Sequence, residues 1–244
     1  MTASESTERW GVGAQSGEDR LVWEYFGRSE QGVFAEVGAN DPELLSQTLF
    51  LEKLGWRGVL VEPQPDCCRR LREKRPNAKI FEAACGSPEQ RGTADFHIAN
   101  DDTRSSLRQY EHDESVHFSS VLKVKVQTLD EILEEAGIER LDFLSVDVEG
   151  CELEVFKGLD LKRHQPRLII VEDYAYTLKL HRHLARAGYR LVKRTGSSNW
   201  YVPRGSKFAF SSPMERVKLF RKMFLGTPLR RWRLRLRGQP VPGN

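Results

Sequence analysis

The sequence predicts an α/β domain built from parallel βαβ units, on the strength of three observations. A strand, a glycine turn, a helix and a second strand follow one another within residues 33–62, which is the order of a βαβ unit. Two later apolar runs, residues 141–146 and 167–172, are typical of buried strands. The chain has 244 residues, enough for one large domain with a substantial core.

A helix is expected after the first strand, residues 33–37. Its start is predicted by a capping acid, a proline and a second acid that complements the helix dipole: Asp41, Pro42 and Glu43. Apolar residues at helical spacing extend this helix to Leu54, and Gly55 ends it. The second strand of the unit then covers residues 58–62.

This βαβ unit suits a nucleoside ligand. Gly38 lets a ligand approach the backbone closely, and free amides at a helix start can receive an anionic group. Glu62, at the tip of the second strand, can accept hydrogen bonds from both ribose hydroxyls. The sequence after Gly38 reads ANDP, so the dinucleotide fingerprint GxGxxG is absent. The unit therefore favours a ribose with a small charged tail, and an ordinary βαβ unit with a surface glutamate is the alternative.

A basic helix and a third strand continue the chain. Asp66 caps the helix, which runs to about Lys74, and residues 79–85 form the strand. The loop after this strand lies at the same edge of the sheet as the glycine turn. Ala84 and Cys85 could therefore border an adenine ring, although packing explains small residues there equally well.

Two further strands are expected at residues 93–98 and 121–126, with a polar, non-periodic segment between them. His112 and His117 lie in that segment among acidic residues. These histidines could bind a metal or act as a catalytic base, and the default interpretation is a solvated loop. Residues 128–131, TLDE, form a capping box that opens the next helix.

Two acids follow the buried strand 141–146 directly. Asp147 and Glu149 lie at the carboxyl end of this strand, where ligands bind in sheets of this kind. Acids in such a place are costly unless they have partners, so they indicate a site. The alternative is that one caps the following helix and the other faces water.

A strand that ends in an acid, a helix and a hairpin-like pair of strands complete the domain, at residues 167–172, 178–187, 189–193 and 199–202. We expect the domain to span residues 16–203, after a flexible N-terminal segment of residues 1–15.

Residues 204–244 form a basic tail. They hold eleven of the 38 Lys and Arg residues but only one of the 35 acids, so the tail carries +10 and the rest of the chain −7. Apolar residues interleave with the basic ones, with Val217, Phe220, Met223 and Phe224 expected on one helix face. This composition suits an anionic membrane surface or a polyanionic substrate, and nucleic acid is possible but not expected. Packing on the domain or on a second subunit, as in a homodimer, is the alternative.

Cysteine usage and the N-terminal sequence indicate where in the cell the protein is expected. The four cysteines form no CxxC pair, which favours a reduced, cytoplasmic protein without a zinc site. The N-terminus lacks a basic region followed by an apolar core, and no run of about eighteen apolar residues occurs, so neither a signal peptide nor a membrane span is expected. If the tail binds lipid, the protein would be peripheral at the inner membrane face.

Four segments, in this order, resemble the FkbM family of S-adenosylmethionine-dependent methyltransferases: FAEVGANDPELLSQTLFLEKLGWRGVLVEP, VKVQTLDEIL, DFLSVDVEGCELEVFKGLD and PRLIIVE. The resemblance covers about residues 16–203, and DVEGxExxVxxG is its most specific part. It implies a class I methyltransferase fold: a Rossmann-like three-layer sandwich whose seven-stranded, mostly parallel sheet has one antiparallel edge strand. The activity that it implies is methyl transfer from S-adenosylmethionine, usually to a hydroxyl oxygen.

The resemblance also implies roles for individual residues. The candidate cofactor-binding residues are Glu36, Gly38, Asn40, Asp41, Glu62, Pro63, Ala84, Cys85 and Asp147. Glu62 matches the ribose-binding acid, and Asn40 and Asp41 lie near the methionine end. The candidate catalytic residues are Asp147 and Glu149.

The chain departs from the family pattern at three of these motif positions. Many members have a second glycine where this chain has Pro42, and many have an aspartate in place of Glu36. Methyltransferases often have an acid before the adenine amine where this chain has Cys85. These departures leave open the shape of the loop and the contact with adenine.

Methyl transfer to an alcohol needs alignment of the reactants and a base for the hydroxyl proton. We hypothesise that Asp147 is this base or positions the acceptor, with Glu149 in support and His97 and His117 as secondary candidates. No His/Asp ligand spacing indicates a metal, so none is expected. Binding of a divalent ion by these acids stays an alternative. The expected acceptor is a sugar, a glycolipid or another small molecule, free or lipid-linked.

Two other functional classes stay open. A nucleotide-dependent oxidoreductase would bind a dinucleotide, which the missing fingerprint disfavours. A non-catalytic Rossmann-like protein would act through its basic tail at membranes, which the acids at the strand tips disfavour.

Overall fold

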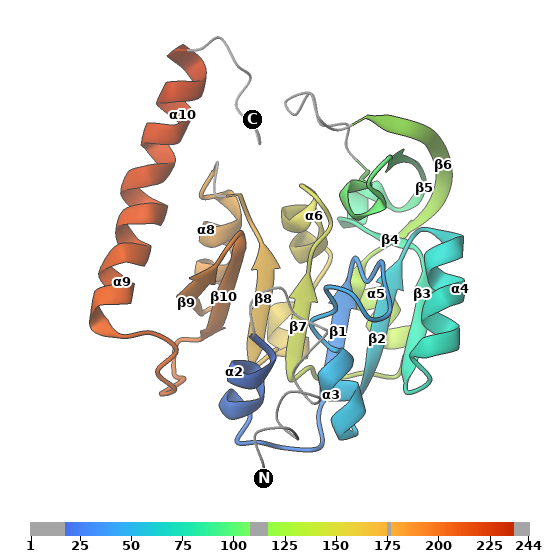
Figure 1. The fold of residues 1–244 in the computed structure, drawn as a ribbon, viewed down its shortest axis with the longest axis horizontal. Coiled ribbons are helices and arrows are strands. Elements are labelled where there is room, and N and C mark those ends of the chain that lie inside the picture. The colour runs from blue at the N-terminus through green and yellow to red at the C-terminus, as the bar shows by residue number, and fades with distance from the viewer. Residues whose placement is uncertain (1–17, 108–116, 175–176, 237–244) are drawn as a thin grey trace.

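The computed structural model describes residues 18–107, 117–174 and 177–236, so the expected flexible segment 1–15 lies outside it. Its main sheet has seven strands in the order β3-β2-β1-β7-β8-β10-β9 (Figure 1). These strands are β1 (Val33–Val37), β2 (Arg57–Glu62), β3 (Ala78–Glu82), β7 (Phe143–Val146), β8 (Leu168–Glu172), β9 (Tyr189–Thr195) and β10 (Ser198–Pro203).

The strand directions confirm the class I methyltransferase fold. All neighbours are parallel except that β10 runs antiparallel to both β8 and β9. The reversed strand therefore lies one place inside the edge, which β9 occupies, and not at the edge as expected. The reason is that β9 and β10 form a hairpin whose second strand inserts between β8 and β9.

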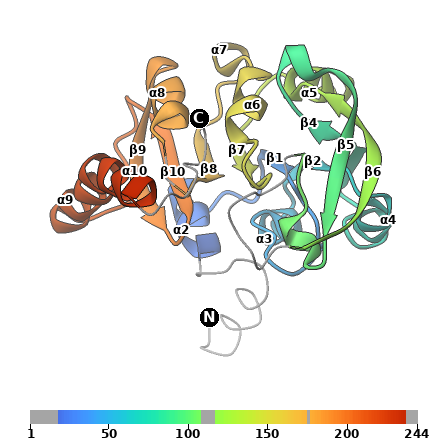
Figure 2. The same cartoon turned by 90° about the horizontal axis from the view of Figure 1, so that it is seen from above.

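Helices cover both faces of the sheet and make three layers (Figure 2). One face carries α2 (Glu18–Tyr25), α3 (Leu49–Leu54) and α4 (Pro65–Lys74), and the other carries α5 (Leu129–Glu135), α6 (Glu152–Lys157), α7 (Leu161–His164) and α8 (Lys179–Arg186). An apolar core fills each interface. Strand alternation divides β1 between them: Ala35 and Val37 enter one core and Phe34 enters the other.

The helix predicted from Asp41 to Leu54 is only partly correct, because residues 41–48 are not helical and α3 begins at Leu49. The cause is the buried carboxylate of Glu36. It accepts hydrogen bonds from the Ser46 hydroxyl (3.1 Å), the Gln47 amide (2.9 Å) and the Thr48 hydroxyl. These bonds wrap the loop around the end of β1, whereas Gly55 ends α3 in the left-handed conformation, as predicted.

Arg75, just after α4, completes this network. Its buried guanidinium donates to the Ser46 hydroxyl (3.0 Å) and the Thr48 hydroxyl (2.8 Å), and it pairs with Glu52 of α3. Buried charges are stable only when they are paired and hydrogen-bonded. The network therefore ties the loop, α3 and α4 to β1.

The strand predicted at residues 79–85 is in fact two strands in different sheets. β3 ends at Glu82, and β4 (Ala84–Cys85) joins a second sheet of order β4-β6-β5, with β5 at Gly92–Ala99 and β6 at Phe118–Gln127. This sheet stands over the carboxyl end of β2 and β3 and has its own small apolar core (Figure 1). Short 3₁₀ turns, η1 (Pro88–Gln90) and η2 (Asp102–Arg104), connect its strands, and the predicted capping box opens α5.

The basic tail forms one long helix beside β9 and β10 (Figure 1). It consists of α9 (Pro213–Phe220), the π-helical turn η3 (Arg221–Leu225) and α10 (Gly226–Leu236). Phe220 and Phe224 share a face, with ring centroids 5.0 Å apart, but Met223 is buried against the domain while Val217 and Phe220 are exposed, so the prediction of one face for all four residues is only partly correct. None of the described helices combines the length and the apolar character needed to cross a membrane.

Candidate functional site

Neighbouring strands bring the predicted site residues to one edge of the sheet. β1 lies between β2 and β7, so the residues that follow these three strands meet. One cavity at this edge is lined by Gly38, Asn40, Glu62, Pro63, Ala84, Cys85, Asp147 and Glu149, among others. A second, adjoining cavity adds Glu36 and Asp41 and shares Gly38, Asn40 and Asp147 with the first. Every candidate cofactor-binding and catalytic residue thus lines one or both cavities.

Gly38 is required by the close approach of two strand ends. Its φ of +84° is unfavourable for other residues, and a Cβ at this position would lie 1.7 Å from the carbonyl oxygen of Asp147. The Gly38 amide donates to Val61 (2.9 Å), and the Asp147 amide donates to Val37 (2.9 Å). The absent side chain therefore lets the ends of β1 and β7 come together beside both cavities.

Glu62 holds the turn after β1 in place. Its buried carboxylate accepts the amide of Asn40 at 3.0 Å and the amide of Gln64 at 2.9 Å, one on each oxygen. A carboxylate oxygen can accept more than one hydrogen bond, and Glu62 lines the first cavity. The arrangement therefore suits a carboxylate that also receives hydroxyl groups of a ligand.

Two other predicted cofactor residues shape the loop around the second cavity. Asp41 accepts the amides of Glu43 (2.9 Å) and Leu44 (2.8 Å), and its other oxygen pairs with Arg70 at 3.1 Å. The Glu36 carboxylate accepts hydrogen bonds from Ser46, Gln47 and Thr48 of the same loop. Both acids line the second cavity while their hydrogen bonds fix its wall.

The far wall of the first cavity is apolar. Burial raises the pKa of the Cys85 thiol, which stays neutral. Phe96 of β5 and Leu107, from the segment that follows β5, complete this wall beside Ala84 and Cys85. Neither was predicted, because only the second sheet, which the sequence did not reveal, brings them to this edge.

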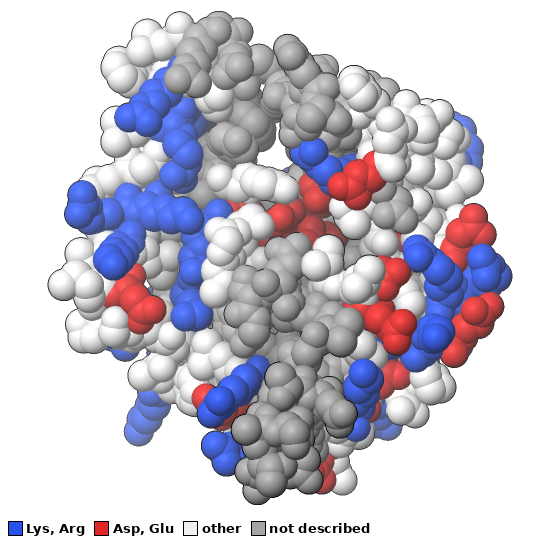
Figure 3. All heavy atoms as spheres, in the orientation of Figure 1, with Lys and Arg blue, Asp and Glu red and all other residues white. Residues whose placement is uncertain are grey.

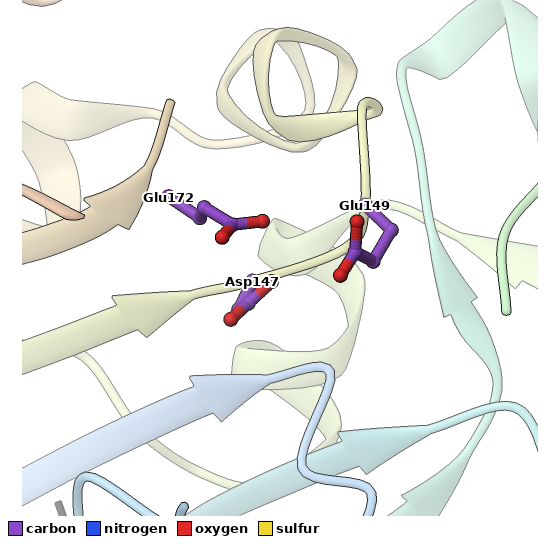
Figure 4. A group of neighbouring side chains, drawn as sticks. All are labelled: Asp147, Glu149 and Glu172. Carbon is purple, nitrogen blue, oxygen red and sulfur yellow. The ribbon is translucent and has the colours of Figure 1, made fainter. Parts of the chain in front are cut away.

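Three acids cluster beside the two cavities: Asp147 lines both, Glu149 lines the first, and Glu172 lies next to them. Asp147, Glu149 and Glu172 each offer a carboxylate oxygen, and these oxygens all lie within 4.8 Å of one another (Figure 4). Glu172 was not among the predicted site residues. The signal that could have found it is the pattern already used for Glu62, a buried strand that ends in an acid.

The surroundings change the acidity of two carboxyl groups here. The Asp147 side chain is open to the cavities, but partial desolvation and then the negative charges of Glu172 and Glu149 raise its pKa above the usual value. Burial raises the pKa of the neighbouring Glu152, outside the cluster, to about 7, against the opposing effect of the hydrogen bond from the Gly150 amide. Acidic side chains accordingly gather in the hollow at the centre of this face (Figure 3).

Among the described residues no histidine lines the two cavities, and of the four cysteines only Cys85 and Cys151 do. His97 on β5 and the exposed His117 are not among the residues that line the two cavities, and His112 lies outside the described residues. All four cysteines are buried and free of disulfides.

Comparison with known proteins relates this chain to a family of methyltransferases. Residues 36–191 match the family described as the methyltransferase FkbM domain. The 2-O-methyltransferase NoeI of Sinorhizobium fredii is 29% identical over 140 residues, which cover 52% of this chain and 56% of that protein. Methyltransferase sdnD of Sordaria araneosa is 40% identical over 68 residues, 23% of this chain and 26% of that one. The chain thus spans only about half, or less, of the length of these relatives.

A similar solved structure is that of methyltransferase FkbM from Methylobacillus flagellatus KT. It has a TM-score of 0.46 and 17% identity, and the match covers 71% of this chain and 44% of that one.

Replacement of Gly38 by alanine should destabilise the domain more than the same change at Gly188. Both glycines have positive φ, but a Cβ at Gly188 would meet nothing within 4 Å. Gly188→Ala should lower the free energy of unfolding by about 1–2 kcal/mol for the left-handed backbone alone. Gly38→Ala should cost roughly 1–3 kcal/mol more, because the Asp147 backbone must move. Urea unfolding of both variants checks this, and equal losses would contradict the close approach.

Proposed function

The chain belongs to the FkbM methyltransferase family, and on this premise we propose that it transfers a methyl group from S-adenosylmethionine to a hydroxyl oxygen of a sugar, a glycolipid or another small molecule. The observation that carries the proposal is the meeting of Gly38, Glu62 and Asp147 at one edge of the sheet. Each residue follows or ends a different strand. Gly38 lets two strand ends approach, Glu62 can accept hydrogen bonds from a ribose, and Asp147 can accept the proton of a hydroxyl group.

The residues of the two cavities fit this cofactor. Glu62 would accept hydrogen bonds from the ribose hydroxyls, and Cys85 and Phe96 would pack on the adenine ring. The missing side chain at Gly38 lets the ends of β1 and β7 meet beside both cavities, so a ligand there would lie against backbone from two strands. The second cavity, which Asn40 and Asp41 line, would take the amino-acid end. When bound, the cofactor supplies the methyl group together with its own leaving group.

Asp147 and Glu149 would handle the acceptor. Asp147 lines both cavities, so a hydroxyl held there would lie next to the donor and could give its proton to this carboxylate. Glu149 sits on a left-handed turn whose carbonyl accepts the Ser106 hydroxyl at 2.8 Å. This bond fixes the turn, and Glu149 would help to orient the acceptor.

Two observations support the acceptor class. The name of the Sinorhizobium relative, a 2-O-methyltransferase, is that of an enzyme acting on oxygen. The basic tail is suited to a lipid-linked or anionic acceptor, given its charge.

Glu62→Gln should weaken binding of S-adenosylmethionine by roughly 10- to 100-fold, because hydrogen bonds to a charged acceptor contribute more than neutral ones. Glu82→Gln is the matched control, since Glu82 lies opposite Glu62 at the end of the neighbouring strand and pairs with Arg72 outside the cavities. Isothermal titration calorimetry of the folded variants checks this, with NAD titrated in parallel. Equal affinities in the two variants, or binding of NAD in place of the methyl donor, would overturn the proposed cofactor.

Asp147→Asn should lower kcat by about 100-fold or more and change the affinity for S-adenosylmethionine little, because it removes a base and keeps the shape. Asp142→Asn, at the other end of β7 where Asp142 pairs with Arg167, should keep wild-type turnover. Transfer of a labelled methyl group to a panel of sugar and glycolipid acceptors gives the measurement. Wild-type turnover by Asp147→Asn would exclude Asp147 as the base.

A further inference from the structure

The acid cluster contains a buried carboxylate oxygen to which no donor hydrogen-bonds in the described part of the chain. Glu172 is only 9% exposed. Its Oε1 accepts the Ser197 hydroxyl at 2.8 Å, whereas its buried Oε2 has no such donor, and the neighbouring Asp147 can donate to Glu172 only when it is protonated. The Glu172 carboxylate points toward Glu149 and lies above Asp147 (Figure 4). A buried carboxylate oxygen in this situation is costly unless a cation or a donor occupies the space beside it.

The spacing of the three acids suits a hard cation. Oxygens that bind one cation lie at most twice the metal–oxygen distance apart, about 4.2 Å for Mg²⁺ and about 5 Å for Ca²⁺. The three carboxylate oxygens lie within 4.8 Å of one another. Small side-chain rotations therefore suffice to close the set around one ion, and ligands that are all oxygen favour Mg²⁺, Mn²⁺ or Ca²⁺.

We propose that Asp147, Glu149 and Glu172 form a binding site for one divalent cation. The sequence shows no metal-ligand spacing here because β7, the turn after it and β8 each supply one ligand. What the ion does rests on the proposed methyl transfer: it would hold the acceptor hydroxyl at the meeting point of the cavities and lower the pKa of that hydroxyl.

The test is a titration of the full chain with Mn²⁺. Binding is monitored by the loss of the free-ion signal in electron paramagnetic resonance, and Mg²⁺ and Ca²⁺ serve as competitors. We expect saturation at one ion per chain. Glu172→Gln and Glu149→Gln should each weaken the affinity about tenfold or more. Asp173→Asn is the control, because it removes the same charge one residue away, where the carboxylate accepts the Asn199 side chain.

Neither methyl donor nor acceptor is present in this titration, so its failure is separate from a failure of the proposed function. Glu149 lies on a half-buried turn, which keeps the test valid if Glu172→Gln does not fold. Absence of saturable binding by the wild type would overturn the site. An equal loss in Asp173→Asn would also overturn it, since that result indicates diffuse attraction by negative charge.

A separate observation concerns the tail helix. Its large exposed apolar residues occur on both sides of the π-turn η3 and are Met214, Val217, Phe220, Leu225, Leu229, Trp232 and Leu236. In an unbroken α-helix, Phe220 and Leu225 would point in different directions, because five residues exceed one turn by more than a third. A π-turn closes over five residues, and here the Gly226 amide donates to Arg221. The π-turn thus brings the apolar residues of α9 and α10 into one stripe.

Most of this apolar stripe faces away from the domain, whereas Phe220 lines a cavity between the helix and the domain and contacts Phe224, with ring centroids 5.0 Å apart. Met223 and Thr227, one turn apart, are buried, and Phe224 contacts His181 of α8 with ring centroids 5.1 Å apart. Exposed basic residues lie along the same helix: Arg216, Lys218, Arg221, Lys222, Arg233 and Arg235. Basic side chains dominate this side of the molecule (Figure 3).

We infer that the apolar stripe docks on an anionic lipid surface. An amphipathic helix with Phe, Leu and Trp on one face and Arg and Lys beside them lies in the plane of such an interface. A second copy of the chain is disfavoured as the occupant, because its tail carries the same +10 charge.

The test is cosedimentation of the full chain with phosphatidylglycerol vesicles and with phosphatidylcholine vesicles. The wild type should bind the former only, and less tightly as salt rises. The double variant Trp232→Ser/Leu236→Ser should lose at least about tenfold in binding, because it removes two buried apolar groups and no charge. Val121→Ser is the control, since Val121 is an equally exposed apolar residue on β6.

Equal binding to both lipids, or equal loss in the control, would overturn this inference. So would a wild-type dimer in solution that the double variant converts to a monomer, because the stripe would then be an interface between copies.

Discussion

The buried charge network around Arg75 is the constraint on which the cofactor side of the site depends. Arg75 is almost fully buried and pairs with Glu52, while its other donors hold Ser46 and Thr48, the partners of Glu36. If one member were removed, the others would be left as buried, unpaired charges or donors. The network therefore fixes the loop between β1 and α3, and this loop forms the wall of the second cavity.

Strand order then decides which side chains meet. Because β1 lies between β2 and β7, the carboxyl ends of these strands bring Gly38, Glu62 and Asp147 together, and β8 adds Glu172. The closeness of β1 and β7 depends on a missing side chain at Gly38. The result is that Glu62 and a cluster of three acids lie at one edge of the sheet. Ligands commonly bind at this edge in open α/β sheets.

The sequence predicted those features that are encoded locally. Sequence patterns located all seven strands of the main sheet, although one was predicted to continue into β4, and they placed Glu62, Asp147 and Glu149 after strands, where these residues line the first cavity. The features it missed depend on residues far apart in the chain. Local signals favoured a helix from Asp41, but the bonds between Glu36, its loop and Arg75 prevail there. The change of sheet at Ala83, which brings Phe96 to the cavity, depends on pairing with β6.

The charges of the domain and of the tail are consistent with one orientation at a surface. Acids concentrate in the hollow at the carboxyl edge, whereas the tail carries +10. Figure 1 shows that α10 extends past this same edge, on the side of the sheet where β9 and β10 lie. An anionic surface that binds the apolar stripe would attract the tail and repel the acid cluster. The site would then open alongside the surface without being covered by it, which is the geometry that an acceptor with a lipid anchor and a soluble head requires.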